Sequence, residues 1–577
     1  MTDPQTVLTE RVQQALAHAF GAEHADADPL IRPSQFADFQ ANVAMSLAKR
    51  LRRAPREVAE AIRAELSDFP GTVEVSGPGF LNITLDDGWI AAGAQGMLDD
   101  SRLGVGTVTP AQTVVIDYSA PNAAKEMHVG HLRTTIVGDA LARLHEHVGN
   151  TVIRQNHLGD WGTPFGMLIE HLLDIGEQAA VGQLEAGMGT EFYQAARAKF
   201  DGDETFKQRA RTRVTTLQSG DPETLRLWHV FMDATVRYFN KVYGLLGVTL
   251  TDADIAGESM YNPMLDQTCH DLEASGTAVL SEGALCVFPP GFTGSDDKPL
   301  PLIIRKSDGG YGYATTDMAA VRYRVHDLKA DRILYVVGAD QALHFRMIFA
   351  AARQAGWLPD TVSAEHVQIG MMLGKDGRRF KTRSGESVKL TGLLDEAVER
   401  ATAAIADRGY DADTQAEIAR AVGMGAVKYA DLSVSHDSEY VFDFDRMLGF
   451  TGNTGPYMQY ATARIRSIFR KAGMEPSEAA LAGRITPGEP AERALSLHLL
   501  GFGELVSQVT AQSEPHRLCA FLFETASLFS TFYEQCPVLR PDVAPEVRAS
   551  RLALCALTLR VLETGLGLLG VPVPERM

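Results

Sequence analysis

Apolar residues in the first 110 positions follow two different spacings. They recur every three or four residues through TVLTERVQQALAHAF (6–20) and FQANVAMSLAKRL (39–51), which predicts two amphipathic helices. The short runs GTVEVS (71–76) and FLNITL (80–85) flank the turn GPG and predict a pair of strands. Residues 1–110 are therefore expected to form a small α+β unit.

The pattern changes at residue 111, where buried strands begin to alternate with helices. The apolar run TVVIDYS (113–119) is followed by a helical segment from about 131 to 147 and by NTVIRQNHLG (150–159). This order predicts a β-α-β unit, and such units build parallel sheets with right-handed crossovers. The fold class expected from it is α/β.

The same sheet is predicted to continue after an interruption. Further apolar runs are LPLIIRK (300–306), DRILYVVGAD (331–340) and HVQIGMMLG (366–374). A polar, mostly helical stretch over about 180–290 separates them from the first unit. We therefore expect a Rossmann-type parallel-sheet domain over 111–395 that carries an inserted module.

After residue 395 the chain is predicted to be helical to its end. A connecting region over 396–450 precedes an all-α bundle over 451–577. The segment GMEPSEAALAGRITPGEPAE (473–492) is the best linker candidate. Three long segments carry apolar stripes at helical spacing: ERALSLHLLGFGELVSQVTAQ (492–512), HRLCAFLFETASLFSTFYEQC (516–536) and PEVRASRLALCALTLRVLETGLGLLG (545–570).

Length and composition indicate three or four globular domains in a reducing compartment. The 577 residues are 45% hydrophobic and 22% charged, and the N-terminal pattern is not that of a signal peptide. Arg560 and Glu563 interrupt the most apolar late stretch, which disfavours a membrane span. The five cysteines are scattered, which disfavours a disulfide framework or a zinc site and favours a cytoplasmic location.

A net charge of −19 argues at first against a nucleic-acid partner, but binding depends on local patches. One basic patch lies in AKRLRRAPREVAEAIR and contains Lys49, Arg50, Arg52, Arg53, Arg56 and Arg63. A solvated helix face and a nucleic-acid contact both fit this pattern.

The segment SAPNAAKEMHVGHLR (119–133), here called the histidine loop, follows the first strand of the sheet. A strand, a short loop and a helix place backbone N–H groups and the positive helix end at one point, which favours an anion site. His128 and His131 can donate to phosphate or ribose oxygens, and Gly130 would let a flat base approach. The junction has neither a Walker-type loop nor a G-x-G-x-x-G fingerprint. Packing of the two histidines is the alternative.

A second candidate is MMLGKDGRRFKTRSGESVKL (371–390), here called the basic loop. Glycine-containing turns bracket its cations, which suits closure over a polyphosphate, and an exposed basic hairpin is the alternative. The cations are Lys375, Arg378, Arg379, Lys381 and Arg383.

The two segments together resemble the signatures of class I aminoacyl-tRNA synthetases, as HVGH and FKTRSG. Wider strings throughout the chain resemble arginyl-tRNA synthetases in particular: SAPNAAKEMHVGHLR, NHLGDWGTPFGMLI, NTGPYMQYATARIRSI, GFLNI and the terminal VPERM. The resemblance implies a ligase that forms arginyl-adenylate from L-arginine and ATP and esterifies the terminal 2′-hydroxyl of tRNA(Arg). It also implies Mg²⁺ with the nucleotide and no metal ligands in the protein, no membrane, and a cytoplasmic monomer.

The resemblance assigns roles to individual residues. The ATP site it implies contains Lys125, His128, Gly130, His131, Lys381 and Arg383, with His128, His131, Lys125 and Lys381 acting in catalysis. The arginine site it implies contains Asp117, Asn122, Tyr313, Asp317 and Gln341. Tyr313 and Asp317 share a helix face if ATTDMAAVRYR is helical, and Asp117 and Gln341 follow strands, so these side chains are expected at one sheet edge.

The expected tRNA contacts lie at the two ends of the chain. Residues 1–110 would recognise a D-loop base through Phe80 and Asn82, and 396–450 would touch the stem. In the bundle, Tyr457, Tyr460 and Arg464 are spaced for one helical stripe that can stack on anticodon bases, and Met577 ends the chain. A core stripe is the alternative for the two tyrosines.

One departure from the family pattern concerns the second signature, which usually reads KMSKS. Its second lysine corresponds here to Thr382, a neutral residue that cannot balance a developing phosphate charge. Lys125, three residues before His128, is the expected substitute, and Lys381 and Arg383 are competing donors. Two alternatives stay open for the whole chain: a duplicate that supplies activated arginine to biosynthesis, and a non-catalytic tRNA-binding protein.

Overall fold

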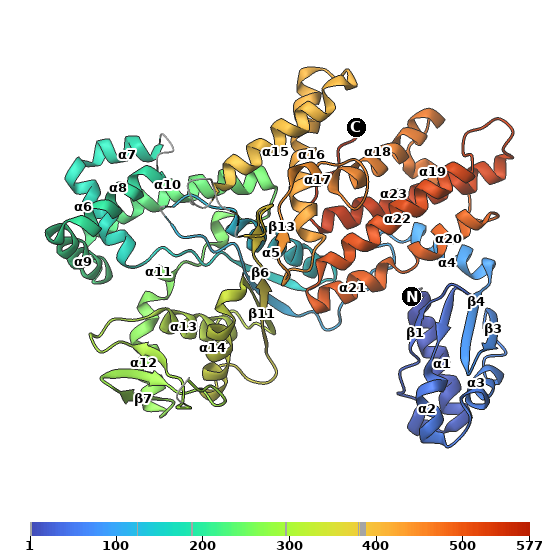
Figure 1. Cartoon of the computed structure of the whole chain (residues 1–577), viewed down its shortest axis with the longest axis horizontal. Helices are drawn as coiled ribbons and strands as arrows, with labels where there is room; N and C mark the ends of the chain where they lie inside the picture. Colours follow the sequence, from blue (N-terminus) through green and yellow to red (C-terminus); the bar gives the residue numbers. More distant parts are fainter. Residues whose placement is uncertain (1–2, 124, 186–188, 295–296, 379, 381–387) are drawn as a thin grey trace.

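The computed structural model describes residues 3–577 except 124, 186–188, 295–296, 379 and 381–387. The N-terminal unit lies to one side of the molecule (Figure 1) and packs three helices against an antiparallel sheet of order β1-β2-β4-β3. Its elements are α1 (Pro4–Phe20), β1 (Ile31–Pro33), β2 (Phe39–Ala41), α2 (Val43–Leu51), α3 (Pro55–Ala64), β3 (Gly71–Ser76), β4 (Phe80–Leu85) and the following α4 (Asp87–Asp99).

The predicted first helix and the strand pair of this unit are confirmed. The second helix was predicted too long, because Phe39–Ala41 forms strand β2 and the helix begins at Val43. Phe39 and Ala41 are buried, and Phe39 pairs with Ile83 of β4. Their alternate burial on the sheet overrides the helical spacing of the longer segment.

The predicted β-α-β unit is confirmed and forms one side of a four-stranded parallel sheet of order β11-β10-β5-β6, with β6 at the edge. Four strands and three helices build this domain: β5 (Thr113–Asp117), α5 (Gly130–His147), β6 (Thr151–Gln155), α13 (Tyr313–His326), β10 (Arg332–Gly338), α14 (Ala342–Gln354) and β11 (Ser363–Ile369). Asp117 pairs with Gln155 on one side and Tyr335 on the other, so these residues share the carboxyl end of the sheet.

One predicted strand of the parallel sheet, LPLIIRK, belongs to another sheet. Leu302–Arg305 forms β9, which joins β7 (Ala278–Ser281) and β8 (Ala284–Val287) in a separate antiparallel sheet. Ile303 of β9 is 46% exposed, and such one-sided burial suits an antiparallel sheet rather than one covered on both faces.

The run HVQIGMMLG also divides, at Gly370. Its N–H donates to the His436 carbonyl and its carbonyl accepts from Arg133, so the parallel ladder ends there. The next residues form β12 (Met372–Leu373), which pairs with β13 (Tyr440–Val441).

The inserted stretch is mostly helical, as predicted, and extends to the left in Figure 1. Its helices, with the one that leads into it, are α6 (Thr163–Ile175), α7 (Glu177–Glu185), α8 (Gly189–Gly202), α9 (Glu204–Gln218), α10 (Pro222–Leu246), α11 (Glu258–Tyr261) and α12 (Leu265–Ala274). Strands β7 and β8 follow α12, so the insertion ends in sheet rather than helix.

The C-terminal part is helical except for β13. It contains α15 (Leu390–Ile405), α16 (Ala412–Leu432), α17 (Phe444–Met447), α18 (Gly455–Ala472), α19 (Pro476–Ala482), α20 (Pro490–Leu499), α21 (Phe502–Gln512), α22 (Pro515–Gln535) and α23 (Pro545–Leu568). The linker prediction for 473–492 is wrong, because α19 lies within it, buries Ala479 and packs on α23. All five cysteines are buried and free.

Arg493 of α20 fastens the N-terminal unit to the bundle. Its guanidinium forms two hydrogen bonds with the Asp38 carboxylate, at 2.7 and 2.8 Å, and one of 2.6 Å with Asp87. In the part of the chain that the structure describes, no helix has the length and apolarity needed to cross a bilayer.

Candidate active site

The histidine loop connects β5 to α5 and holds its two imidazoles side by side. The ring centroids of His128 and His131 are 3.9 Å apart. The His128 backbone N–H donates to Nδ1 of His131 at 3.1 Å, and the Gly130 N–H donates to Nδ1 of His128 at 3.0 Å. A ring nitrogen that accepts carries no proton, so each ring presents Nε2–H as a donor.

His131 is neutral at physiological pH in this arrangement. Burial, His128 and Lys125 together lower the pKa of His131 to about 3. A Cβ at position 130 would lie 2.8 Å from Cε1 of His128, so glycine is required there for the ring to occupy this place. The loop therefore presents two imidazole N–H donors, of which His131 is uncharged, at the positive end of α5.

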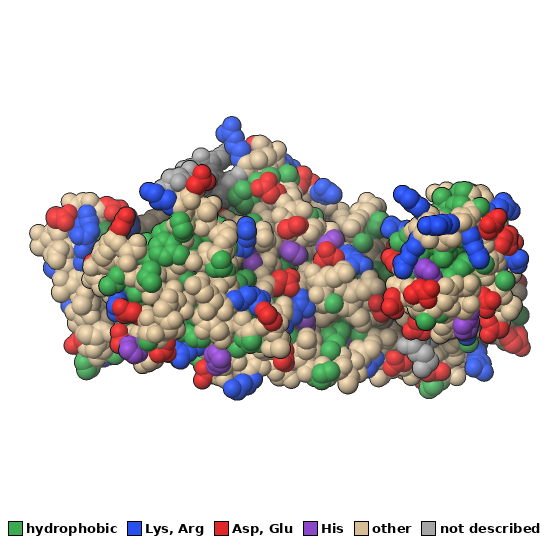
Figure 2. Space-filling view, turned by 90° about the horizontal axis from the view of Figure 1, so that it is seen from below, with side chains coloured by type: hydrophobic (Ala, Val, Ile, Leu, Met, Phe, Trp, Pro, Cys, Tyr) green, Lys and Arg blue, Asp and Glu red, His purple; other side chains and the backbone are tan. Residues whose placement is uncertain are grey.

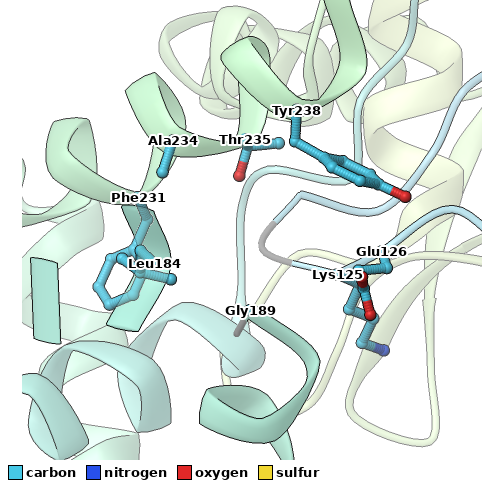
Figure 3. Close-up of a pocket in the computed structure, with 8 residues that line it drawn as sticks. All are labelled: Lys125, Glu126, Leu184, Gly189, Phe231, Ala234, Thr235 and Tyr238. Carbon is cyan, nitrogen blue, oxygen red and sulfur yellow. The ribbon is translucent and has the colours of Figure 1, made fainter. Parts of the chain in front are cut away.

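Lys125, within the histidine loop, lies at the rim of a pocket shared with the insertion (Figure 3). Leu184, Phe231 and Tyr238 are among the residues that line it. The Lys125 side chain is exposed, and Nζ is 4.4 Å from the ring centroid of Tyr193 on α8. Lys125 is close enough to His131 for its charge to lower the pKa of that imidazole, and its contact with Tyr193 was not foreseen from the sequence.

The next residue, Glu126, ties three segments together. Its carboxylate pairs with Lys389 at 2.7 Å and accepts a hydrogen bond from Thr190 of α8. The Met127 N–H donates to the Tyr238 hydroxyl on α10 at 3.1 Å. The helices of the insertion thus hold the chain immediately before His128.

The basic loop is only partly described. Lys381, Thr382 and Arg383 lie outside the described residues, so their predicted roles stay predictions. Lys375 pairs with Asp443 at 3.1 Å and lies 3.5 Å from Asp445.

Asp117 ends β5 as predicted, but the chain's own Arg324 engages it. Arg324 Nη2 donates to Asp117 Oδ2 at 2.7 Å and Nε donates to Gln155 Oε1 at 2.6 Å, with both side chains of the ion pair buried. Among the described residues Asp117 Oδ1 has no hydrogen-bond partner. One carboxylate oxygen is thus taken and one is left for another donor.

Asp317 lies on α13, where the predicted helix is confirmed. Its Oδ2 is 2.6 Å from Nε2 of His344 on α14. Gln341 ends the short 3-10 helix before α14, three residues from His344, while Tyr313 begins α13 with a side chain 78% exposed. Asp317 and Gln341 are thereby brought to the same end of the sheet.

Glu258 completes an acidic cluster with Asp317 and Asp160. Burial, Asp160 and Asp317 raise the pKa of Glu258 to about 8, although the nearby backbone of Trp161 acts in the opposite direction. Asp160 is itself buried and accepts from the N–H and hydroxyl of Ser259 at 2.9 and 2.6 Å.

The histidine loop borders this cluster. The Ala123 N–H donates to the Gly159 carbonyl at 3.0 Å, and Asn122 forms a β-bridge with Gly159, next to Asp160. Sequence reasoning missed Glu258, Asp160, Arg324 and His344. Asp160 lies within one of the quoted strings, whereas nothing in the spacing pointed to the other three.

The predicted tRNA residues have well-defined surroundings. On β4, Asn82 donates from Nδ2 to Ser76 at 3.1 Å and accepts from Gln40 of β2 at 2.8 Å. Phe80 is half-buried on the same strand.

In α18 the predicted stripe divides between two environments. Tyr457 packs on Phe523 of α22, 5.9 Å between ring centroids. Tyr460 and Arg464 line a pocket with Met577, and the Arg464 guanidinium is 4.2 Å from the Tyr533 ring centroid. The rest of this pocket is strongly basic, with Arg408, Arg470 and Lys471.

Comparison with known protein families covers almost the whole chain. Residues 95–444 match the catalytic domain of "tRNA synthetases class I (R)", residues 458–577 the "DALR anticodon binding domain", and residues 6–85 the "Arginyl tRNA synthetase N terminal domain".

Individual relatives and solved structures agree with these matches. An arginine–tRNA ligase of Thermobifida fusca is 62% identical over 581 residues, covering 100% of both chains. One of Edwardsiella ictaluri is 48% identical, covering 99% of this chain and 100% of the relative. The crystal structure of arginyl-tRNA synthetase from Plasmodium falciparum aligns over the full length of both chains with a TM-score of 0.84 at 27% identity. The Thermus thermophilus arginyl-tRNA synthetase, at 24% identity and a TM-score of 0.81 over both full lengths, shows the same fold. With a family match over most of its length and relatives this similar from end to end, the chain belongs to the arginyl-tRNA synthetases of class I.

Proposed function

We propose that the carboxyl end of the parallel sheet joins L-arginine to tRNA(Arg) in two steps, as an arginine–tRNA ligase does. The observation that carries this proposal is the pair of Nε2–H donors on His128 and His131 at the start of α5, beside an acidic cluster. Imidazole N–H donors and a helix N-terminus suit the phosphates and ribose of ATP. A desolvated cluster of carboxyl groups suits a guanidinium.

In the first step an arginine carboxylate oxygen attacks the α-phosphorus of ATP. The bond from that phosphorus to the β-phosphate bridge oxygen breaks, and pyrophosphate leaves. His128 and His131 hold the nucleotide, Gly130 lies against the adenine, and Lys125 balances charge on the leaving pyrophosphate, with Lys381 and Arg383 as competing donors. The protein acts mainly by positioning and by charge stabilisation.

The substrate arginine is proposed to lie between the sheet edge and α11. Its guanidinium meets Glu258 and Asp317, and the free oxygen of Asp117 accepts from it or from the α-ammonium group. Asn122, Tyr313 and Gln341 complete the site. Support comes from the raised pKa of Glu258, because a cation bound there would relieve the repulsion among the three carboxyl groups.

In the second step the 2′-hydroxyl of the terminal adenosine attacks the carbonyl carbon of the adenylate. AMP leaves with the carbonyl–oxygen–phosphorus bridge oxygen, the ester forms, and the hydroxyl proton passes to solvent. Residues 1–110 are proposed to bind the D-loop through Phe80 and Asn82, and 396–450 the stem. The pocket of Tyr460, Arg464 and Met577 in 451–577 is proposed to bind anticodon bases, with Tyr457 supporting it from the α22 side.

Mg²⁺ is proposed to enter with ATP as part of the substrate. Within the described residues no three His, Cys, Asp or Glu side chains gather as metal ligands, so we assign it no protein ligand and derive no step through it. We extend the proposal to a monomer that works in the cytoplasm.

Arginine-dependent ATP–pyrophosphate exchange, measured with and without tRNA(Arg), tests the assignment together with charging of the tRNA. A ligase for translation shows exchange and stable arginyl-tRNA. Exchange without charging would instead indicate a supplier of activated arginine, and tRNA binding without exchange a non-catalytic protein. Either result would refute the proposal.

A further inference from the structure

One basic patch of the sequence is used by none of the sites above. Residues 49–56, KRLRRAPR, contain five cations and no carboxylate in a chain of net charge −19. They cover the end of α2, the turn to α3 and the start of α3. All five side chains are exposed, and we call this set the basic corner: Lys49, Arg50, Arg52, Arg53 and Arg56.

The basic corner is not neutralised by carboxylates of its own unit. Among the described residues, Lys49, Arg50 and Arg52 make no ion pair and no side-chain hydrogen bond, and Arg53 lies 5.7 Å from the ring centroid of Phe20. Arg63, the sixth cation of the sequence patch, differs because it pairs with Glu60 at 2.7 Å. The five positive charges therefore face solvent together. Figure 2 shows Lys and Arg side chains gathered on the N-terminal unit, at the right of that view.

The basic corner is continuous with the strand that carries Phe80 and Asn82. Arg56 Nη1 donates to the Gly77 carbonyl at 3.4 Å. A Cβ on Gly79 would lie 2.7 Å from the Pro55 carbonyl oxygen, and one on Gly77 would lie 3.3 Å from the Phe80 ring. The start of α3 thus packs directly against the β3–β4 turn, and cations and an aromatic ring share one edge of the unit.

The attachment of the unit leaves this edge open. Asp38 and Asp87, which bind Arg493, lie outside α2 and α3, and Figure 1 shows α2 and α3 on the part of the unit that is farther from the helical bundle. A long polyanion can therefore approach the corner and Phe80 at the same time.

We propose that the basic corner binds the sugar–phosphate backbone of the tRNA next to the base that Phe80 and Asn82 contact. The inference rests on the proposed function and adds a phosphate-binding surface to it. Lys and Arg on a surface contact phosphates without reading sequence, and they position the neighbouring base contacts. In a strongly acidic chain such a local concentration of cations also overcomes the repulsion between protein and RNA.

The backbone at Arg52 permits an unusually clean test. Arg52 has φ 53°, in the left-handed region that favours glycine, so Arg52→Gly removes the charge without straining the chain. Lys329 is also exposed and has φ 56°, which makes Lys329→Gly the matched control for charge and backbone.

The experiment compares two triple variants of the full chain. The corner variant is Lys49→Gln, Arg50→Gln, Arg52→Gly. The control removes the same charge from other exposed positions: Lys329→Gly, Arg353→Gln, Arg540→Gln. The Kd for a tRNA(Arg) transcript is measured by anisotropy between 50 and 200 mM salt, with exchange at saturating tRNA as the readout of the active site.

If the three cations contact phosphates, the corner variant shows a smaller dependence of tRNA binding on salt. The slope of the logarithm of the association constant against the logarithm of the salt concentration falls by about 2 to 3 in magnitude. The weakening at 50 mM salt then exceeds that at 200 mM by about 20–40-fold, for three contacts. The control variant keeps the wild-type slope, and both variants keep the exchange rate at saturating tRNA. A tRNA with an altered D-loop base loses the same factor as the natural one, because phosphate contacts carry no sequence information.

Equal slopes in the corner and control variants would overturn the inference. They would show that only the net charge of the whole chain affects tRNA binding. Normal tRNA affinity together with lost binding to phosphatidylserine vesicles would overturn it in favour of a membrane surface. If the wild type charges tRNA while the corner variant binds normally, only this inference fails. If the wild type neither charges nor binds tRNA, the proposed function fails as well.

Discussion

Glu258 should make arginine binding release a proton. Its pKa of about 8 without substrate means that about nine-tenths of the side chains are protonated at pH 7. A guanidinium at the carboxyl favours the ionised form and therefore expels the proton. As the pH is raised towards 8, the affinity for arginine should therefore increase by up to about tenfold per pH unit. Above pH 8 the affinity should level off.

The stability of the folded protein should also depend on pH, because the pKa of Glu258 is raised on folding. A carboxyl group whose pKa is higher in the folded chain than in the unfolded one stabilises the fold at low pH. This contribution is lost as the pH rises from about 4.5 through about 8. Arginine offsets the loss, so the increase in Tm produced by saturating arginine should be larger at pH 8.5 than at pH 6.5.

Calorimetry in two buffers of different ionisation enthalpy measures the released proton directly. Glu258→Gln should abolish the release at pH 7 and flatten the pH profile, with the larger loss of affinity at pH 8.5. The other groups facing the cluster are Asp160 and the Asp317–His344 pair, so His344→Gln is the control and should keep the slope. If Glu258→Gln binds arginine with the wild-type pH profile, Glu258 does not contact the substrate.

The remaining predictions concern single side chains. Asp317→Asn should raise the KM for arginine by the equivalent of about 1.5–3 kcal/mol in exchange assays and leave the KM for ATP unchanged. An unchanged KM for arginine would show that Asp317 does not contact the substrate. Lys125→Ala should slow adenylate formation by roughly 10²–10³, and adding Thr382→Lys should restore part of the rate. Near-normal exchange in Lys125→Ala would move the role to the basic loop. Asn82→Ala should lower discrimination between wild-type tRNA and D-loop variants in charging assays without changing the affinity for ATP. If the ratio of the two charging rates is unchanged, Asn82 does not contact the D-loop base. Arg133→Met should lower the free energy of unfolding by about 3–5 kcal/mol in urea titrations, because Asp431 stays buried without its partner. Wild-type stability would show that the pair contributes nothing.

Local patterns in the sequence were enough to locate several elements and the histidine loop. β3 and β4 follow directly from apolar runs around a glycine-rich turn, and α13 from the helical composition that spaces Tyr313 and Asp317 one turn apart. These features depend on neighbours within a few residues, which is the range over which spacing carries information. The place of Asp117 at a strand end is predictable for the same reason.

Contacts between distant segments could not be predicted in this way. Glu258 lies far along the chain from both Asp160 and Asp317. No pattern in the sequence around Glu258 indicates that its carboxyl group is buried. Arg324 is seven residues beyond Asp317 on the same helix, yet it serves as the internal partner of Asp117 rather than as a surface cation. The predicted sheet of the strand Leu302–Arg305 was wrong for a related reason, because an apolar run does not indicate which sheet the strand joins.

Buried cations also explain how α5, which contains His131 and begins shortly after His128, is fixed relative to the helical part of the chain. Near its start, Arg133 donates to Asp431 of α16 at 3.1 Å and to the carbonyls of Gly370 and Ser438 at 2.8 and 2.7 Å. Two turns later, Asp139 faces the fully buried Lys428 of the same helix α16, whose Nζ donates to the Leu246 carbonyl at the end of α10.

Buried charges cost free energy unless each is paired, so two such sites between one pair of helices allow little freedom in their relative orientation. The second site also borders the chain end after α23, where a Cβ on Gly570 would lie 2.8 Å from Lys428 Nζ. One helix therefore connects the two histidines, the strand end at Gly370, the insertion and the bundle. The side chains that fix this arrangement, Arg133, Asp139, Lys428 and Asp431, are distinct from the two histidines and from the cations of the basic loop.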